Sequence, residues 1–263
     1  MSAITFIVPV SDRDQYQRYF LSSPLFERES HFEILAQAGF RTSGQAYNDG
    51  IQKAQNDLIV CAHQDVVLPA MWATRFLARR SEVESIGVPV GVVGCWGRTP
   101  KGDYVGHIYH RDRELFPQRA LPARVQTLDE LLISLRKSSG LRFDPDLPSF
   151  FGYAVDLCLQ AQVRGLHNFV VDAPCIHQSA DRKSVQKDMY KSWMYLLRKW
   201  KDFLPVWTPS GRIDGRWSYW KDLIREYAFH AMGYSPRPWW LRYPQVNREA
   251  ALFGDTASTK DRD

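Results

Sequence analysis

A histidine and an aspartate, two positions apart, directly follow an apolar run of the chain. The run Leu58–Ala62 has the length and composition of a buried strand, and Pro69 cannot continue a hydrogen-bonded ladder. Because side chains alternate across a strand, His63 and Asp65 point the same way and could hold one ion. Ligands of open α/β sheets bind outside the carboxyl ends of strands, so the pair predicts a metal or diphosphate site. The alternative from these residues alone is a polar strand end exposed to water.

The segments around this pair alternate between strand and helix. Repeated strand, helix and strand build a mostly parallel sheet through right-handed crossovers, which predicts an α/β fold. The helix over 43–54 has Ala46, Gly50, Ile51 and Ala54 along one face and leads directly into the strand at Leu58. We expect strands at Thr5–Val10, Phe32–Ala36, Gly87–Trp96 and Phe169–Val171, helices at Met71–Arg80 and Tyr153–Arg164, and a hairpin or mobile loop over 98–124.

Composition is that of an ordinary soluble globular protein. The chain has 263 residues, 44% hydrophobic and 24% charged, enough for one large domain or a core domain with an extension. No apolar stretch approaches the roughly 20 residues that span a bilayer, and the run 4–10 contains Pro9 and lacks the basic flank of a signal peptide. The four cysteines form no CxxC pair and stand in apolar contexts, which predicts reduced core residues of a cytosolic protein.

The C-terminal part differs from the rest in charge and aromatic content. Between Arg182 and Arg248 there are 14 Lys and Arg against 5 Asp and Glu, although the whole chain carries only +5. Helix spacing begins near Met189, and the polar end of the chain is expected to be a disordered tail. Two interpretations stay open: a surface for a membrane or an anionic acceptor, or aromatic residues that pack this part onto the core. No nucleic-acid-binding pattern is present. The region contains Trp193, Trp200, Trp207, Trp217, Trp220, Trp239 and Trp240.

Five segments occur in a recognisable order: 6–10, 46–57, 63–69, 152–159 and 173–177. Together they resemble the inverting, family-2-like glycosyltransferases of the GT-A fold, in the subgroup whose metal-binding DxD triplet is HQD. The resemblance spans about residues 4–180 and implies a GT-A catalytic domain over 1–180. The helical Trp-rich extension over 181–263, and its candidate contact to the inner membrane surface of a cytoplasmic enzyme, are expected from helix spacing and composition instead. The resemblance also implies sugar transfer from a nucleotide-sugar donor to a glycan, lipid-linked or small-molecule hydroxyl acceptor.

The same resemblance assigns nucleotide-binding positions. Pro9 and Val10 would line the nucleotide pocket at the end of the first strand. Gln37 stands where such enzymes often have an acidic residue that contacts the base, which leaves the base preference open. Asn48 and Asp49 would face the nucleotide from the following helix, although Asn48 could equally be a simple cap.

Metal ligands are also implied by the resemblance. His63 and Asp65 take the DxD positions: Asp65 would hold the divalent ion that bridges the two phosphates, and His63 would lie against the metal or the ribose. His177 would supply a further ligand. Imidazole together with carboxylate suits Mn²⁺ at least as well as Mg²⁺.

The catalytic base is where the chain departs from the family pattern. The usual carboxylate position holds Ala154, and the nearest acid is Asp156, which we predict as the base because a helix start favours the ionised form. The alternative is that Asp156 is a conventional acidic residue of the first helical turn and that the chain is impaired in catalysis. Asp129 and Glu130 are the reserves, with Glu130 also a candidate contact to acceptor or sugar; the alternative for both is a solvated helix start. Trp96 could stack on sugar or acceptor, or belong to the core.

Two other functions compete with transfer. The substitution at Ala154 is compatible with a catalytically silent member that only binds nucleotide or glycan. A nucleotidyltransferase would need a Gly-rich and basic phosphate loop after the first strand, and Ser11–Asp14 is not one.

Overall fold

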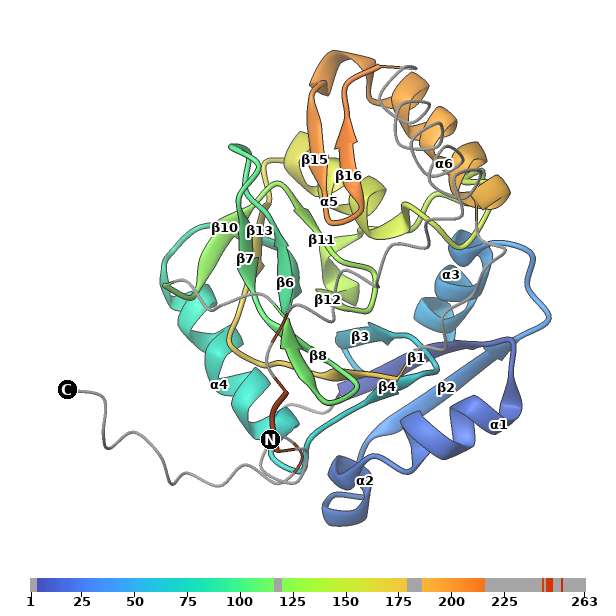
Figure 1. Cartoon of the computed structure of the whole chain (residues 1–263), viewed down its shortest axis with the longest axis vertical. Coiled ribbons are helices and arrows are strands. Elements are labelled where there is room, and N and C mark those ends of the chain that lie inside the picture. Colours follow the sequence, from blue (N-terminus) through green and yellow to red (C-terminus); the bar gives the residue numbers. More distant parts are fainter. Residues whose placement is uncertain are drawn as a thin grey trace.

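A seven-stranded mixed sheet forms the centre of the molecule (Figure 1). The computed structural model describes residues 4–115, 120–178, 186–215, 243, 245–247 and 252. The strand order is β10-β13-β5-β12-β3-β1-β2. Neighbours β1/β2, β1/β3 and β5/β13 are parallel, whereas β12 runs antiparallel to β3 and β5, and β10 runs antiparallel to β13. The strands are β1 (Ile4–Val10), β2 (Glu33–Ala38), β3 (Leu58–Ala62), β5 (Val90–Gly94), β10 (Ala123–Val125), β12 (Leu132–Arg136) and β13 (His167–Val170).

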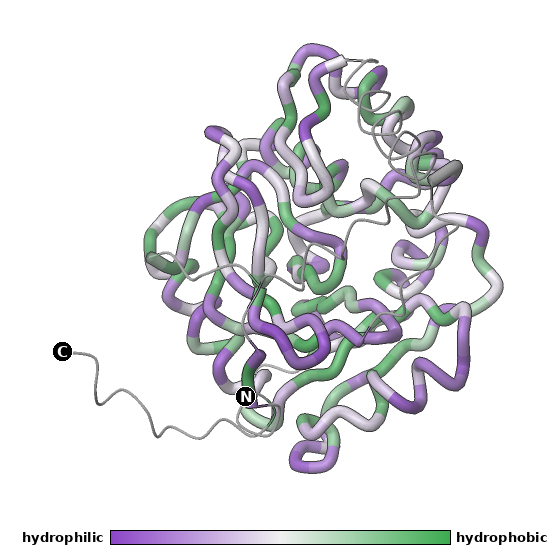
Figure 2. Tube along the Cα trace, viewed as in Figure 1, coloured by the Kyte–Doolittle hydropathy of each residue, from purple (hydrophilic) through white to green (hydrophobic). Residues whose placement is uncertain are grey.

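Alternate residues of each central strand supply two separate hydrophobic cores, and the hydrophobic colour of Figure 2 follows these strands. In β1, Ile7 belongs to the core under α3 (Ser43–Lys53) and α5 (Tyr153–Val163). Phe6 and Val8 belong to the opposite core. That core is covered by the π-helix Tyr16–Leu21, α2 (Pro24–Arg28) and α4 (Trp72–Ser85), whereas the short α1 (Arg13–Gln15) buries no residue. This two-sided burial explains why β3 is apolar throughout rather than alternating.

Smaller sheets flank the central one at its carboxyl edge. One has the order β4-β14-β8-β9, and another has the order β11-β6-β7. The segment expected as a hairpin or loop forms two antiparallel hairpins, β6–β7 and β8–β9, which confirms the hairpin alternative. The predicted strand 87–96 is divided into β5 and β6. These elements are β4 (Val66–Val67), β6 (Trp96–Arg98), β7 (Tyr104–Gly106), β8 (Ile108–His110), β9 (Arg113–Leu115), β11 (Thr127–Leu128) and β14 (Ile176–His177).

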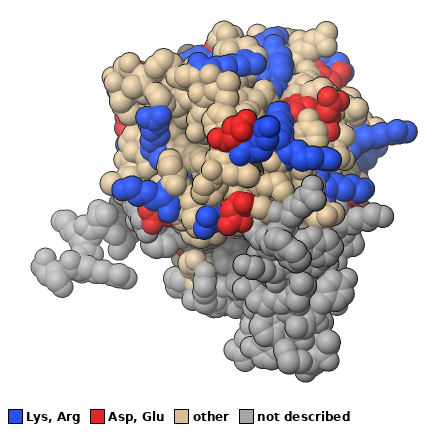
Figure 3. All heavy atoms as spheres, turned by 90° about the horizontal axis from the view of Figure 1, so that it is seen from above, with Lys and Arg blue, Asp and Glu red and all other residues tan. Residues whose placement is uncertain are grey.

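The described C-terminal part packs against the α5 side of the sheet. It consists of α6 (Gln186–Lys199), a 3₁₀ helix at Lys201–Phe203 and the hairpin of β15 (Val206–Thr208) and β16 (Gly211–Ile213). Trp193 and Trp200 are buried in the core that α3 and α5 cover, as the packing interpretation predicts. Among the coloured, described residues of Figure 3, viewed from the side of this hairpin, basic and acidic side chains are interspersed. Trp217, Trp220, Trp239, Trp240 and the predicted tail lie outside the described residues.

Two further expectations concern the cysteines and membrane-spanning helices. All four cysteines, Cys61, Cys95, Cys158 and Cys175, are buried and free, which confirms them as core residues. Among the residues that the structure describes, no helix is both long and apolar enough to cross a bilayer.

Candidate active site

The candidate site lies where β3 ends and a short antiparallel pair begins. His63 and Asp65 follow β3 directly, as the apolar run predicts. Strand β14 then pairs with β4, which sets His177 opposite Val66, and the backbone N–H of Gln178 donates to the Asp65 carbonyl at 2.9 Å. The ladder therefore fixes His177 beside Asp65 although 112 positions of chain separate them.

Three side chains converge at this point. His177 Nε2 lies 3.4 Å from Asp65 Oδ2, and His63 Nδ1 lies 4.0 Å from Asp65 Oδ1. One ligand atom from each of the three residues falls within 4.8 Å of the others, which is the spacing of a set that could share one cation. Each residue is partly exposed, so the set is open to a ligand from solvent.

The protonation states also suit metal ligands. Burial lowers the pKa of His63 to about 4, although the charge of Asp65 opposes this, so the imidazole is neutral at pH 7. Burial would raise the pKa of Asp65, but hydrogen bonding to His177 and the charges of both histidines outweigh it and lower the pKa to about 2. A neutral imidazole and an ionised carboxylate are the forms in which these groups bind metal.

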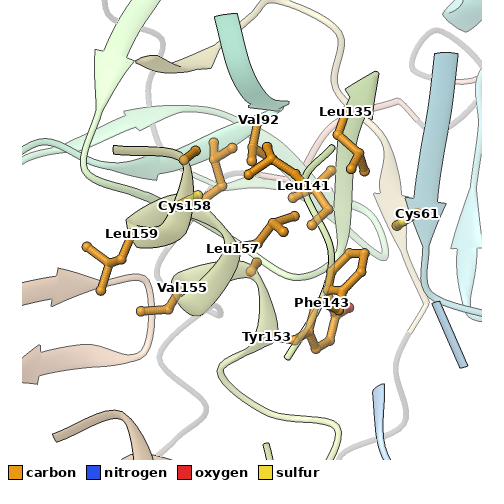
Figure 4. Packing of buried hydrophobic residues seen from close by; sticks show 14 of the residues in the cluster. Cys61, Val92, Leu135, Leu141, Phe143, Tyr153, Val155, Leu157, Cys158 and Leu159 are labelled. Atoms are coloured by element: carbon orange, nitrogen blue, oxygen red, sulfur yellow. The ribbon is translucent and has the colours of Figure 1, made fainter. Parts of the chain in front are cut away.

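Tyr153, the first residue of α5, determines which nitrogen of His63 carries the proton. Its hydroxyl donates to the Glu130 carbonyl at 2.7 Å and also lies 2.9 Å from His63 Nε2 and 3.1 Å from the Tyr47 hydroxyl. A hydroxyl has one hydrogen, so towards His63 it can only accept. His63 Nε2 must then be the donor, which leaves the lone pair on Nδ1, the nitrogen nearer Asp65. Figure 4 includes Tyr153 beside Phe143, whose ring centroid is 5.8 Å away.

Tyr153→Phe is therefore expected to weaken Mn²⁺ binding about 10- to 100-fold, the usual cost of losing the partner that orients a metal-ligating histidine. His63 Nε2 would lose its acceptor, and the ring could adopt the other tautomer. Titration calorimetry with Mn²⁺ measures the affinity. Tyr16→Phe, a buried tyrosine in the opposite core, is the matched control. Equal Mn²⁺ affinity of Tyr153→Phe and the wild type would contradict this role.

Gln64, between His63 and Asp65, faces the other way and holds the loop after β1. Its Oε1 accepts from the backbone N–H of Ser11 at 2.8 Å and of Asp12 at 3.0 Å, and its Nε2 donates to Ser11 Oγ at 3.1 Å. The loop borders a pocket with about 910 Å³ of empty space, lined in part by Val10, Ala36 and Ala38 from the ends of β1 and β2. The segment 63–65 thus has two functions. It supplies two members of the cation set, which we define as His63, Asp65 and His177, and through Gln64 it holds the loop that borders this pocket.

The other sequence-predicted nucleotide contacts have varied surroundings. Val10 lines the pocket, whereas Gln37 is buried and pairs in register with Pro9, so neither of these two is among the lining residues. Asn48 Nδ2 donates to the Phe143 carbonyl at 2.8 Å, and the Phe143 backbone N–H donates to Asn48 Oδ1 at 3.0 Å. Asp49 forms an ion pair with Lys53 at 2.6 Å. The helix cap is Thr42 rather than Asn48, since Thr42 accepts from Gln45 N–H.

Glu130 lies at the N-terminus of α5, bordering a second pocket. This pocket has about 480 Å³ of empty space between α5, α6 and the β15–β16 hairpin. Burial first, and then the charge of Asp129, raise the pKa of Glu130 to about 8, although the backbone N–H groups of Gly152, Tyr153 and Ala154 oppose the shift. A carboxyl group with such a pKa can accept a proton near neutral pH.

Asp156, the predicted base, is enclosed on the other side of α5. It is 1% exposed, and its carboxylate accepts from Trp200 Nε1 at 2.7 Å, Gln160 Nε2 at 2.6 Å and Lys199 Nζ at 2.7 Å. Lys199 also binds Asp144, and although burial lowers its pKa, these two acids raise it overall. Asp156 joins α5 to α6 and does not line the pocket that Glu130 borders.

Asp156→Ala is expected to destabilise the fold, with the buried Trp200 indole N–H alone costing about 1–3 kcal/mol once its acceptor is gone. Asp156→Asn keeps an oxygen for that indole and should cost less. Urea unfolding followed by circular dichroism gives both values. An alanine variant as stable as the wild type would show that this cluster does not anchor α6.

Trp96 belongs to the core rather than to either pocket. It is 7% exposed and stacks on Tyr104 at 5.8 Å between ring centroids. The core interpretation, which the sequence left open, matches this environment.

The sequence and the fold of the chain are both similar to those of known proteins. Residues 5–198 match a family described as "Glycosyltransferase like family". The chain belongs to this family. The match covers the central sheet, most of α6, and all three residues His63, Asp65 and His177.

Two further similarities concern the glycosyltransferase-like chain. It is 22% identical over 181 residues to "ATP synthase subunits region ORF 6" of Fuscovulum blasticum, covering 64% of this chain and 71% of that protein. Its structure is similar to that of S. aureus TarS 1–349 in complex with UDP-GlcNAc, with 10% identity and a TM-score of 0.51. The similarity covers 76% of this chain and 66% of TarS 1–349, just under two thirds of it. This likeness confirms a GT-A-like α/β fold.

A third comparison is with the mannosyltransferase PcManGT from Pyrobaculum calidifontis in complex with GDP-Man and Mn²⁺. It is 10% identical, covers 86% of the glycosyltransferase-like chain and 69% of that protein, and has a TM-score of 0.49.

Sequence reasoning missed two residues of the site. Tyr153 appears in the sequence as one more apolar helix residue, and its partners are 90 and 106 positions away. Gln64 stands between two predicted ligands, and strand alternation already indicates that it faces away from them.

Proposed function

We propose that this chain is a metal-dependent, inverting glycosyltransferase that moves a sugar from a nucleotide-sugar donor to a hydroxyl acceptor. The observation that carries the proposal is the convergence of His63, Asp65 and His177 at the end of a central strand in a chain of this family. His63-Gln64-Asp65 would take the part of the DxD triplet. Nitrogen and oxygen donors together favour Mn²⁺ at least as well as Mg²⁺.

The donor would lie across the end of β1, between the cation set and the β1–β2 pocket. A bound divalent ion would neutralise the charge that accumulates on the departing nucleoside diphosphate. Gln64 would keep the Ser11–Asp12 loop in position for the nucleoside, and Tyr153 would keep His63 Nδ1 available.

Glu130, rather than Asp156, is the base that this geometry favours. The acceptor hydroxyl gives its proton to the Glu130 carboxylate while its oxygen forms a bond to the anomeric carbon. The bond from that carbon to the phosphate oxygen breaks, and its electron pair leaves with the nucleoside diphosphate. Attack opposite to the leaving group inverts the anomeric configuration. Glu130 borders an open pocket, whereas Asp156 is held by Lys199 and Trp200.

A thermal-shift panel tests the donor half of the proposal. UDP, GDP, dTDP and CDP, and the corresponding sugars beginning with UDP-GlcNAc, are each added with and without Mn²⁺. Stabilisation that needs nucleotide and ion together is the expected result, about 2.7 kcal/mol when ligand exceeds its Kd 100-fold. No stabilisation by any nucleotide with Mn²⁺ would contradict the proposal.

The competing function is nucleotide or glycan binding without turnover. It is motivated by Ala154, the buried alanine at the usual base position. Mn²⁺-dependent donor hydrolysis or transfer that is lost in Glu130→Gln supports the enzyme, whereas tight binding with no turnover across a broad donor and acceptor panel supports the binding protein.

A further inference from the structure

We propose that the pocket between α5, α6 and the β15–β16 hairpin binds the acceptor, and that it selects uncharged hydroxyl compounds with an apolar face over phosphorylated or carboxylated ones. The proposal rests on the proposed function, because it names the acceptor class of that reaction. It replaces the anionic acceptor that the basic C-terminal composition suggests.

The walls of the pocket are largely apolar. Phe151, Met189, Trp193, Leu196 and Ile213 contribute to them, from α6, the hairpin and the approach to α5. Two lining hydroxyl groups are already engaged, since Ser192 Oγ lies 2.7 Å from Ser149 Oγ and Thr208 Oγ1 donates to the Gly211 carbonyl at 2.8 Å. Such walls suit the apolar face of a sugar ring or an aromatic aglycone.

The ionisable groups at the pocket are carboxyl groups. Asp129 and Glu130 are the ionisable residues among the described lining residues, and no Lys or Arg is included in that lining. Arg212, on the same hairpin, stacks over Trp207 at 5.0 Å and pairs with Asp214 at 3.3 Å. A phosphate group on the acceptor would meet two carboxyl groups and no Lys or Arg among the described lining residues, which disfavours binding.

The hairpin that closes the pocket is held in place before any ligand arrives. The backbone N–H of Trp207 donates to Gln126 Oε1 at 2.8 Å, and the Tyr104 hydroxyl donates to the Pro209 carbonyl at 3.1 Å. The Arg98 guanidinium lies 3.8 Å from the Tyr104 ring centroid and 5.0 Å from that of Trp207.

The test compares p-nitrophenyl β-D-glucoside with its 6-phosphate by titration calorimetry, in the presence of Mn²⁺ and the best-stabilising nucleoside diphosphate. Ser210 is an exposed lining residue at the hairpin turn. Ser210→Trp should fill the pocket mouth, and Ser210→Arg should supply the missing cation. Ser85→Trp and Ser85→Arg, at an exposed position on α4, are the matched controls.

We expect the neutral glucoside to bind at least about tenfold more tightly than the phosphate, Ser210→Trp to abolish that binding, and Ser210→Arg to narrow the preference. Equal or tighter binding of the phosphate, or no binding of either glucoside, would overturn the proposal. Nucleotide and Mn²⁺ affinity, measured in the same titrations, reports on the proposed function separately. Intact donor binding with no glucoside binding contradicts only the acceptor assignment, whereas absent donor binding contradicts the transferase itself.

Discussion

Asp65→Asn is expected to abolish Mn²⁺-dependent nucleotide binding, with a loss of on the order of 100-fold or more in metal affinity. The substitution removes the negative charge while keeping the size of the side chain. Loss of a partner that merely orients a ligand costs about 10- to 100-fold, so loss of the one carboxylate in this set should cost at least as much. Both histidines would then face a neutral amide, and the cation would have no anionic ligand among the three residues.

Calorimetric titration of Mn²⁺ in the presence of UDP measures this effect. Asp172→Asn is the matched control, because Asp172 is also close to a histidine, with its Oδ1 3.9 Å from His107 Nε2, but is not part of the cation set. The control should bind Mn²⁺ as the wild type does. If Asp65→Asn binds Mn²⁺ and nucleotide normally, the cation does not bind at this strand end.

Glu130→Gln is expected to lower kcat by about 10²- to 10⁴-fold, the usual contribution of a general base, while nucleotide and Mn²⁺ affinity stay unchanged. The amide keeps the shape of the side chain but cannot accept the acceptor's proton. Asp156→Asn is the discriminating control. It should retain most of the turnover per folded molecule, since Asp156 contacts Trp200, Gln160 and Lys199 instead of the pocket.

The pH dependence follows from the same group. A base must be ionised, and the pKa of Glu130 is raised to about 8, so kcat/KM should rise with pH and level off above about 8. A bound cation favours the carboxylate, which makes 8 the upper limit of the midpoint. In Glu130→Gln this rise should disappear. Loss of turnover in Asp156→Asn with normal turnover in Glu130→Gln would return the role of base to α5.

Apolar runs with clear boundaries were predictable from the sequence. The strand Leu58–Ala62 was predicted with its observed bounds, and the helix 43–54 differs from α3 by one residue. The antiparallel strand β12 was not identified, because Asp129 and Glu130 interrupt the apolar run 125–135 and an apolar run carries no information about direction. Those two acids lie just before the strand, where they reach the second pocket.

The candidate site was predictable only where local spacing defines it. Strand alternation was enough to bring His63 and Asp65 together, whereas His177 required the family resemblance because a ladder between distant segments fixes its position. The orientation of α5 could not be derived from the sequence. Residues 153–159 are all buried, so no polar stripe indicates which face Asp156 occupies.

The residue type at position 152 depends on the backbone conformation there and on the neighbouring helix α6. Gly152 precedes α5 with φ +81°, and a Cβ there would lie 2.6 Å from Leu196 Cδ1 of α6. The positive φ favours glycine at this position, and any Cβ would have to displace the end of the Leu196 side chain. In a homologue without a docked C-terminal helix the crowding disappears, and asparagine, which tolerates positive φ, becomes acceptable. The residue at this position could therefore serve as a marker, in genome sequences, of which relatives cover the start of α5 with a helix of their own.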